Sequence, residues 1–286
     1  MSPRHAPWTE AADFTIGLRP IPEADWLEGG EPNPALRKDA LFATNRAAVF
    51  AETEASRPGQ GEAAEMIDAA IGPDTAPQAG LPPLYAAARR VADDLCLMEP
   101  SDGAWRLSAL SLSAGSFFRA DDVLGRSLAE LHGPVHGFGD RFLARVERIF
   151  GGLRPGLVLE RRNWSLVNSD ALSLPDSAPV RARIGEIAPE DAGRALFTRV
   201  ERQTLRRLPR TGGALFTIRI WLTPLEEIAA EPRALEAFAR AWRDAPAAFR
   251  DYKRLDLYDR LIDAFLRAHG ESHSVNGTGS PSLRAT

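Results

Sequence analysis

The strongest constraint on the fold is a set of five β-like runs, two pairs of which are joined by hairpin-type connections. The connections, residues 99–103 and 209–213, both contain Pro and Gly. Runs joined this closely pair antiparallel, and no strand–helix–strand rhythm indicates a parallel sheet. The sequence therefore predicts an α+β fold in which helices pack beside an antiparallel sheet. The five runs are residues 94–98, 105–113, 157–164, 198–208 and 214–222.

Apolar residues at helical spacing predict the helices that cover this sheet. Residues 121–131 are expected to form one helix, which Gly133 and Pro134 end. The Pro- and Gly-containing stretch 56–62 predicts a loop. The other expected helices are residues 34–50, 63–71, 84–92, 142–150 and 258–266.

The patterning predicts a single folded domain. We expect a flexible N-terminus over residues 1–13, one domain over 14–269, and a disordered Ser- and Gly-rich tail over 270–286. No run approaches the roughly 18 apolar residues of a membrane span. The first residues also lack the apolar core of a secretory signal. The expected protein is therefore soluble and cytoplasmic, with no membrane contact.

Charge and cysteine content exclude several kinds of protein. The 35 Lys and Arg residues against 39 Asp and Glu residues give a net charge of −4, which argues against nucleic-acid binding. Cys96 is the only cysteine, so a disulfide framework, a multi-thiolate zinc site and a four-thiolate iron–sulfur cluster are all excluded. The sequence also has no Walker A loop, no dinucleotide-binding glycine fingerprint and no nucleophile elbow.

The run 198–208 is unusually charged for a β-strand. Strand alternation puts Glu201 and Gln203 on one face, and Arg202 and Arg206 on the other. In a central strand these charges must be paired or must face a ligand, because burying an unpaired charge is costly. In an edge strand, water would solvate them. The sequence is compatible with both placements, a central strand and an edge strand.

Two of the five histidines lie at a predicted helix end. His132 and His136 are four residues apart, the spacing of a metal pair on a continuous helix. Gly133 and Pro134 interrupt that helix, so we do not expect both rings to chelate one ion. A histidine at this position can also bond the last helical carbonyls, and that structural role is the simpler interpretation.

Six stretches, taken in order, resemble one known family. They are Phe14-Thr15-Ile16-Gly17-Leu18, Asp94-Leu95-Cys96-Leu97-Met98, Leu131-His132-Gly133-Pro134-Val135, Arg162-Asn163-Trp164, Glu201-Arg202-Gln203-Thr204-Leu205-Arg206-Arg207-Leu208-Pro209 and Leu215-Phe216-Thr217-Ile218-Arg219. The sequence resembles the heme-dependent oxidative N-demethylases, the heme-bearing α-subunits of dimethylamine-monooxygenase-type enzymes. The resemblance implies a PAS-like antiparallel sheet that holds heme b. It also implies oxidation of a small, dimethylamine-like secondary amine to a primary amine and formaldehyde with dioxygen.

The resemblance implies that His132, in the family's His-x-Pro-Val motif, is the axial ligand of the heme iron. One neutral imidazole would leave the opposite side of the iron open for dioxygen. The family usually has a Pro where this chain has His136. His136 is therefore an alternative ligand, and a bis-histidine form is a further alternative.

The other expected site residues lie on three of the predicted strands. Glu201 is the expected catalytic residue: it could pair with a substrate ammonium and take its proton, or it could be an ordinary salt-bridge partner. Arg162, Arg202 and Arg219 are the candidates for the two heme propionates, because a guanidinium suits a carboxylate.

Electrons must come from other chains, because this one has no dinucleotide fingerprint. The resemblance implies separate reductase or ferredoxin-type subunits that carry flavin and an iron–sulfur cluster and take electrons from NADPH. The alternative function is a PAS-like sensor that binds heme or another small ligand without turnover. A relative that has lost heme altogether is a third interpretation.

Overall fold

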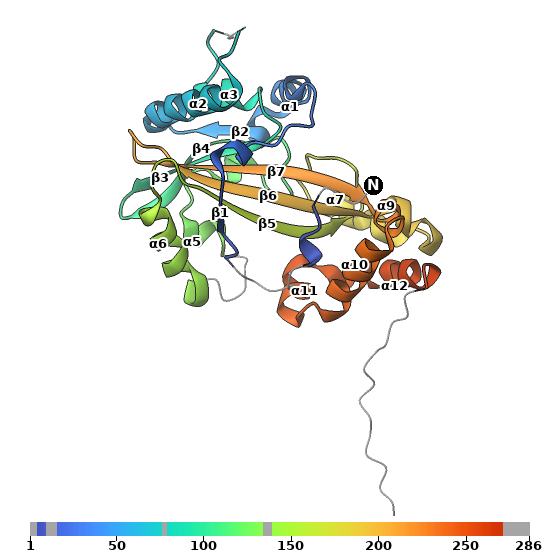
Figure 1. Ribbon diagram of the computed structural model, residues 1–286. Helices are drawn as coiled ribbons and strands as arrows, with labels where there is room; N and C mark the ends of the chain where they lie inside the picture. The colour runs from blue at the N-terminus through green and yellow to red at the C-terminus, as the bar shows by residue number, and fades with distance from the viewer. Residues whose placement is uncertain (1–4, 10–15, 76–78, 134–138, 271–286) are drawn as a thin grey trace, which may run out of the picture.

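The computed structural model describes residues 5–9, 16–75, 79–133 and 139–270 and contains one seven-stranded sheet (Figure 1). The strand order is β1-β5-β6-β7-β3-β4-β2, and every neighbouring pair is antiparallel. This confirms the predicted α+β class and all five predicted strands. The strands are β1 (Arg19–Ile21), β2 (Phe50–Glu52), β3 (Asp94–Ser101), β4 (Ala104–Ser111), β5 (Val158–Val167), β6 (Phe197–Arg207) and β7 (Ala214–Pro224).

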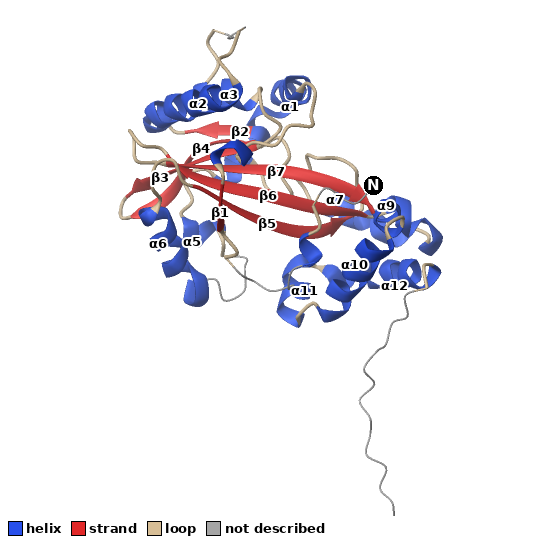
Figure 2. Cartoon of the chain, viewed as in Figure 1, coloured by secondary structure: helices blue, strands red, loops and turns tan. Residues whose placement is uncertain are grey.

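Helices gather at both ends of the sheet (Figure 2). In the described part of the chain, none of them is long and apolar enough to cross a bilayer. They are α1 (Pro34–Val49), α2 (Arg57–Ile71), α3 (Pro83–Ala88), α4 (Ala120–Val123), α5 (Leu128–Leu131), α6 (Ala144–Gly152), α7 (Ala178–Ala182), α8 (Ala192–Ala195), α9 (Leu225–Ala229), α10 (Pro232–Asp244), α11 (Ala247–Lys253) and α12 (Asp259–Ala268).

The strand register assigns each charged residue of β6 to one face of the sheet. Glu201 lies opposite Asn163 of β5 and Ile220 of β7, and directly paired residues share a face. Arg202 lies opposite Arg162 and Arg219 on the other face. The predicted alternation is therefore confirmed. We call these surfaces the Glu201 face and the Arg202 face. The Glu201 face of the three strands includes Leu159, Arg161, Asn163, Arg199, Glu201, Gln203, Leu205, Phe216, Ile218 and Ile220.

The Arg202 face is buried under two apolar clusters. At one end, Leu95, Leu97 and Leu215 pack against α2 and α3. At the other end, Trp164 and Val200 pack against α9 to α12. Trp8, only 2% exposed, makes edge-to-face contacts with Trp164 and Phe238 in this second cluster. Residues near the N-terminus therefore belong to the core.

The Glu201 face also has an apolar cluster at each end. Leu205, with Cys96 and Met98 from β3, packs against α4, α5 and α6. Val167 packs with Leu174 and with Val180 of α7. The stretch of β5 and β6 between these clusters carries polar side chains and is the part of the sheet that concerns function.

The predicted loop 56–62 is wrong, because α2 begins at Arg57. Pro58 occupies the first turn of the helix, where its missing N–H costs nothing. Gly59 packs closely against β3, since a Cβ there would lie 2.5 Å from Oε1 of Glu99 and 3.0 Å from a side-chain methyl of Leu97. The Pro and Gly that suggested a loop thus serve a helix start and a close helix–strand contact.

The predicted single helix 121–131 is two short helices, α4 and α5. Gly125, with a φ of 78°, interrupts it in a conformation that glycine adopts easily. Ser127 and Glu130 then form a reciprocal capping box that starts α5. His132 directly follows this helix, as the sequence predicted.

Candidate functional site

In the middle of the Glu201 face, polar side chains of central strands remain partly exposed. Arg161, Asn163, Glu201 and Gln203 are half-buried, although β6 has a neighbouring strand on each side. In contrast, Glu160, Arg202 and Thr204 on the other face are fully buried. This polar middle lies between the two apolar clusters of its face. The arrangement suits a ligand with apolar and anionic parts.

The Glu201 carboxylate is held from its own strand. Gln203, two residues along β6, donates from Nε2 to Oε2 of Glu201 at 3.0 Å. Residues spaced by two lie on the same face of a strand, so this bond runs along the sheet surface. It orients one carboxylate oxygen and leaves the other available to a cation.

Two guanidinium groups lie near Glu201. Burial lowers the pKa of Arg161 and of Arg199, while Glu201 acts in the opposite direction on both. Arg199 is fully buried and donates from Nη2 to the carbonyls of Ala114 and, at 3.1 Å, Leu172. Its Nε and Nη1 have no hydrogen-bond partner among the described residues. Such buried, unpaired donors are costly unless an anion meets them.

Helix α11 adds a third cation to this region. Tyr252 and Lys253 end the helix, with Nζ of Lys253 5.2 Å from the centre of the Tyr252 ring. Burial lowers the pKa of Lys253 to about 8, Glu201 raises it and Arg161 lowers it further. Burial, and then Glu201, raise the pKa of the Tyr252 hydroxyl. Glu201 is therefore a carboxylate set among Arg161, Arg199 and Lys253.

His132 borders the same face. A carbonyl can only accept, so Nδ1 of His132 donates to the carbonyl of Leu128 at 2.8 Å. This bond places the proton on Nδ1 and leaves Nε2 with the lone pair that a metal requires. Burial lowers the pKa of His132, the Leu128 bond raises it and Arg161 lowers it. A neutral imidazole with a fixed tautomer is the state of a metal-binding histidine.

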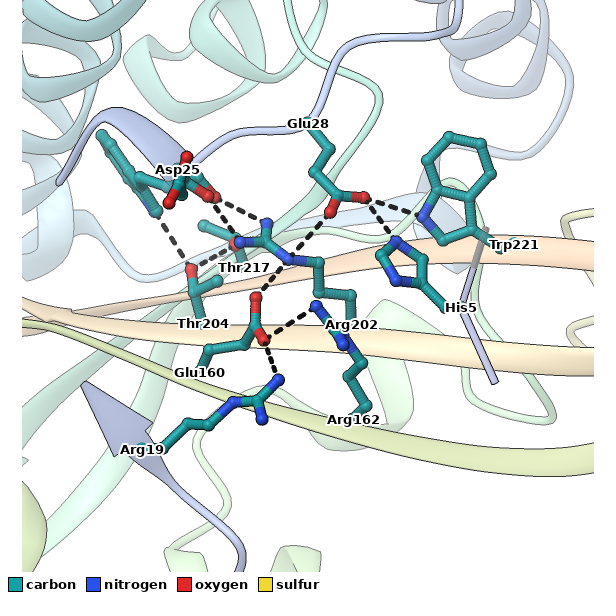
Figure 3. Close-up of polar contacts among 11 residues, drawn as sticks. His5, Arg19, Asp25, Glu28, Glu160, Arg162, Arg202, Thr204, Thr217 and Trp221 are labelled. Carbon is teal, nitrogen blue, oxygen red and sulfur yellow. Dashed lines mark hydrogen bonds and ion pairs between the residues drawn. The ribbon is translucent and has the colours of Figure 1, made fainter. Parts of the chain in front are cut away.

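The structure places Arg162, Arg202 and Arg219 on the Arg202 face, away from Glu201. Figure 3 shows Arg162 and Arg202 beside Glu160. Nε of Arg202 lies 2.5 Å from Oε2 of Glu160, and Nη2 of Arg162 lies 3.1 Å from Oε1 of the same carboxylate. Arg219 is 3.8 Å from Glu31. These three arginines, expected from the sequence to hold propionates, are thus engaged by carboxylates of the chain itself.

The segment before α1 supplies many of these partners. Glu28 lies 3.3 Å from Nε of Arg202 and accepts hydrogen bonds from His5 and Trp221 (Figure 3). Arg202 also donates to the backbone carbonyls of Asp25 and Trp26. The Arg202 face is therefore closed by a buried ion-pair network.

The remaining candidate from the sequence, His136, is outside the described residues. No group of three or more His, Cys, Asp or Glu side chains that could hold a metal occurs within the described ranges. A surface hollow of about 520 Å³ is lined by Glu52, Glu54 and Arg57 at β2 and the start of α2, at the far edge of the sheet.

Arg161, Arg199 and Lys253 are residues near Glu201 that the sequence did not indicate as site residues. Arg199 lies two residues before Glu201 on β6, so strand alternation puts both on the same face. Arg161 pairs with Gln203 and lies on this face too. Assigning the residues of β5 to alternate faces would have separated Arg161 from Arg162. Lys253 carries no such signal, because its electrostatic interaction with Glu201 depends on how α11 packs in the tertiary fold.

A family model for the haem-dependent oxidative N-demethylase, alpha subunit-like proteins matches residues 38–262. The match covers most of the chain and includes every strand from β2 to β7. It also includes His132, Glu201 and Lys253.

Proposed function

The chain belongs to the haem-dependent oxidative N-demethylase, alpha subunit-like family, and we propose that it oxidatively demethylates a small, dimethylamine-like secondary amine. The products would be a primary amine and formaldehyde. We further propose that the antiparallel sheet is PAS-like and that heme b binds over the polar middle of the Glu201 face.

The residues of this face fit the chemistry of heme. The observation that carries the proposal is His132, whose Nδ1–H bond to Leu128 leaves Nε2 able to bind iron. Arg199 offers buried donors without partners, and Arg161 lies on the same face. Both suit carboxylates, so we propose them as the propionate partners. Arg162, Arg202 and Arg219 are the less favoured choice, because Glu160 and Glu31 already engage them.

Bound heme would supply the activation of dioxygen. The protein side chains would bind the amine and move its proton. A small secondary amine is an ammonium ion near neutral pH, and the Glu201 carboxylate would pair with it through charge-assisted hydrogen bonds. The same carboxylate oxygen would accept the ammonium proton, so that the nitrogen becomes neutral before oxidation. Gln203 would hold the carboxylate in place during this transfer.

The family description implies additional subunits, because this chain is alpha subunit-like. We propose that they are reductase or ferredoxin-type chains that carry flavin and an iron–sulfur cluster and pass on electrons from NADPH. The single cysteine, Cys96, is buried on β3, and burial raises the pKa of its thiol. Within this chain it is poorly suited to ligate a cluster. We also propose that the protein acts in the cytoplasm.

The test is formaldehyde release. Heme-loaded protein with dimethylamine, dioxygen and a chemical or enzymatic reductant should release formaldehyde. Glu201→Gln should raise KM for the amine about tenfold or more, because the cation loses its charged partner. Heme binding without formaldehyde from any small secondary amine would contradict the enzyme and support the sensor alternative. Absence of heme binding would contradict the enzyme and support a relative that has lost heme.

A further inference from the structure

One end of the sheet combines two aromatic rings with a guanidinium group. The rings of Trp105 on β4 and Phe150 on α6 lie 5.3 Å apart, and the guanidinium of Arg207 on β6 lies 5.4 Å from the centre of the Trp105 ring. Arg207 also donates from Nη1 to the carbonyl of Phe150 at 3.4 Å. These contacts join β4 and β6 to the last turn of α6. We call the surface around them the Trp105 surface.

The segment before α5 belongs to the same surface. Arg106, next to Trp105, donates from Nη1 to the carbonyl of Gly125 at 3.0 Å. The backbone N–H of Leu107 donates to the carbonyl of Arg126 at 3.0 Å. Helix α5 follows at once and ends directly before His132. The Trp105 surface and the expected iron ligand therefore share one short helix.

Helix α6 presents its positive side outward here. Val146, Ile149 and Phe150 pack inward, in the apolar cluster on the Glu201 face. Arg145 and Arg148 are exposed on the outer side of the helix. The outer surface of the layer that covers this end of the Glu201 face is therefore basic.

The Trp105 surface is positive, although the whole chain has a net charge of −4. We define it as residues 104–107, 124–133 and 142–157 together with Arg207. On neighbouring α4, Asp121 and Asp122 both lie within ion-pair distance of Arg119. The charged residues of the Trp105 surface are six arginines and two glutamates: Arg106, Arg126, Arg145, Arg148, Arg154, Arg207, Glu130 and Glu147.

We propose that the Trp105 surface is the docking site of an acidic electron-transfer protein, an iron–sulfur carrier of ferredoxin type. This choice of partner rests on the proposed function, which requires electrons from another chain. A partner seated on α5 and α6 contacts the layer that ends in His132 and covers the Glu201 face. The surface thus lies where an electron donor to that face is needed.

The composition of the surface suits such a partner. Exposed arginines attract an acidic protein and speed its encounter with the surface. Trp and Arg are also the side chains most enriched at the centres of protein interfaces, and Trp105 is half-buried between Arg207 and Phe150. Because the chain as a whole is negative, a nucleic acid is the less favoured partner.

The test is binding of a plant-type ferredoxin, an acidic iron–sulfur protein, to the full-length chain. Calorimetry at low salt should give a micromolar Kd, which weakens at least tenfold at physiological salt because the contacts are ionic. Bound ferredoxin should also slow amide hydrogen exchange in residues 145–154. Failure to bind at low salt, or binding that salt does not weaken, would overturn the proposal. Tighter binding of a short DNA duplex would overturn it in favour of a nucleic acid.

Charge reversal locates the docking site. Arg145→Glu with Arg148→Glu should weaken ferredoxin binding at least tenfold. The matched control is Arg240→Glu with Arg243→Glu, an exposed pair of the same spacing on α10, at the opposite end of the sheet (Figure 2). It should leave the Kd nearly unchanged. Equal losses in the two double variants would contradict the assignment.

Arg126→Glu provides a second variant on a different segment, in case the α6 double variant fails to fold. It should weaken ferredoxin binding severalfold, because its exposed charge belongs to the same surface. Unchanged binding in Arg126→Glu and in the α6 variant would move the docking site elsewhere.

The outcome is separable from that of the proposed function. Ferredoxin binding is measured without amine, on heme-free and heme-loaded protein. Binding by a protein that releases no formaldehyde would leave the docking site standing. Formaldehyde release with a chemical reductant, from a protein that does not bind ferredoxin, would overturn the docking site alone. In an active protein, Arg145→Glu with Arg148→Glu should lose release supported by ferredoxin and keep release driven by the chemical reductant.

Discussion

Nε of Arg202 lies 2.5 Å from Oε2 of Glu160, and the two side chains are only 2% and 3% exposed. This ion pair joins two central strands on the face opposite to Glu201. Arg162, Arg202 and Arg219 lie directly across from one another on three adjacent strands. Such a row of like charges requires carboxylates, and Glu160 supplies the one that contacts two of them.

Glu160→Gln should strongly destabilise the fold. The substitution removes the charge but keeps the shape, so Arg202 and Arg162 lose a buried counter-charge. We expect a loss of roughly 3–5 kcal/mol in the free energy of unfolding, measured by urea denaturation. The matched control is Glu236→Gln in the exposed pair with Arg240 on α10, which should cost about 1 kcal/mol or less. Equal effects would contradict the structural role of the network.

Arg161→Gln should weaken heme binding about tenfold, because a propionate loses one charged partner, which is worth about 1.4 kcal/mol. Arg162→Gln is the matched control on the neighbouring residue of β5. It should leave heme affinity unchanged, because its side chain lies on the opposite face. Heme titration followed by absorption measures both. A loss of affinity in Arg162→Gln alone would support the propionate assignment made from the sequence.

Asp93 should impose a pH dependence on stability. Its carboxylate is 1% exposed, neither oxygen has a hydrogen-bond partner among the described residues, and burial raises its pKa to about 6. Between about pH 4 and pH 6 the folded state therefore binds a proton that the unfolded state has released. The contribution of Asp93 to stability is complete below pH 4 and is lost as the pH rises through 6.

Asp93→Asn isolates this contribution. The variant should gain stability relative to the wild type as the pH rises from 4 to 7, by on the order of 2–3 kcal/mol. Urea denaturation of both proteins across this range measures the difference. A difference that is constant with pH, or that changes in the opposite direction, would contradict a raised pKa for Asp93.

Much of the sheet could be predicted from the sequence, because alternation is a local signal. The five runs, the two hairpins and the faces of Glu201 and Arg202 follow from residues close together in the chain. The placement of Glu28 beside Arg202 could not be predicted, since it depends on how the segment before α1 crosses the sheet. The helix at 57–62 was missed because Gly59 reads as a turn until its contact with Glu99 is known.

The site was only partly predictable, because it also depends on contacts between residues that are far apart in the chain. His132 was identified from its motif, and its hydrogen bond to Leu128 suits the proposed role. The propionate candidates were chosen by residue type, which does not reveal that Glu160 already binds Arg162 and Arg202. Arg161 differs from Arg162 by one position and therefore lies on the other face. The direction of the side chain, which composition does not show, therefore distinguishes Arg161 from Arg162.

The central claim, that His132 binds heme iron, is tested most directly by absorption spectroscopy of His132→Ala with His269→Ala as the matched control. His269 also follows a helix and bonds a backbone carbonyl four residues earlier, that of Phe265, at 2.8 Å. His132→Ala should lose the Soret band of bound heme while remaining folded, and His269→Ala should retain it. An unchanged Soret band in His132→Ala, with its loss in His136→Ala, would contradict the assignment and move the ligand to His136.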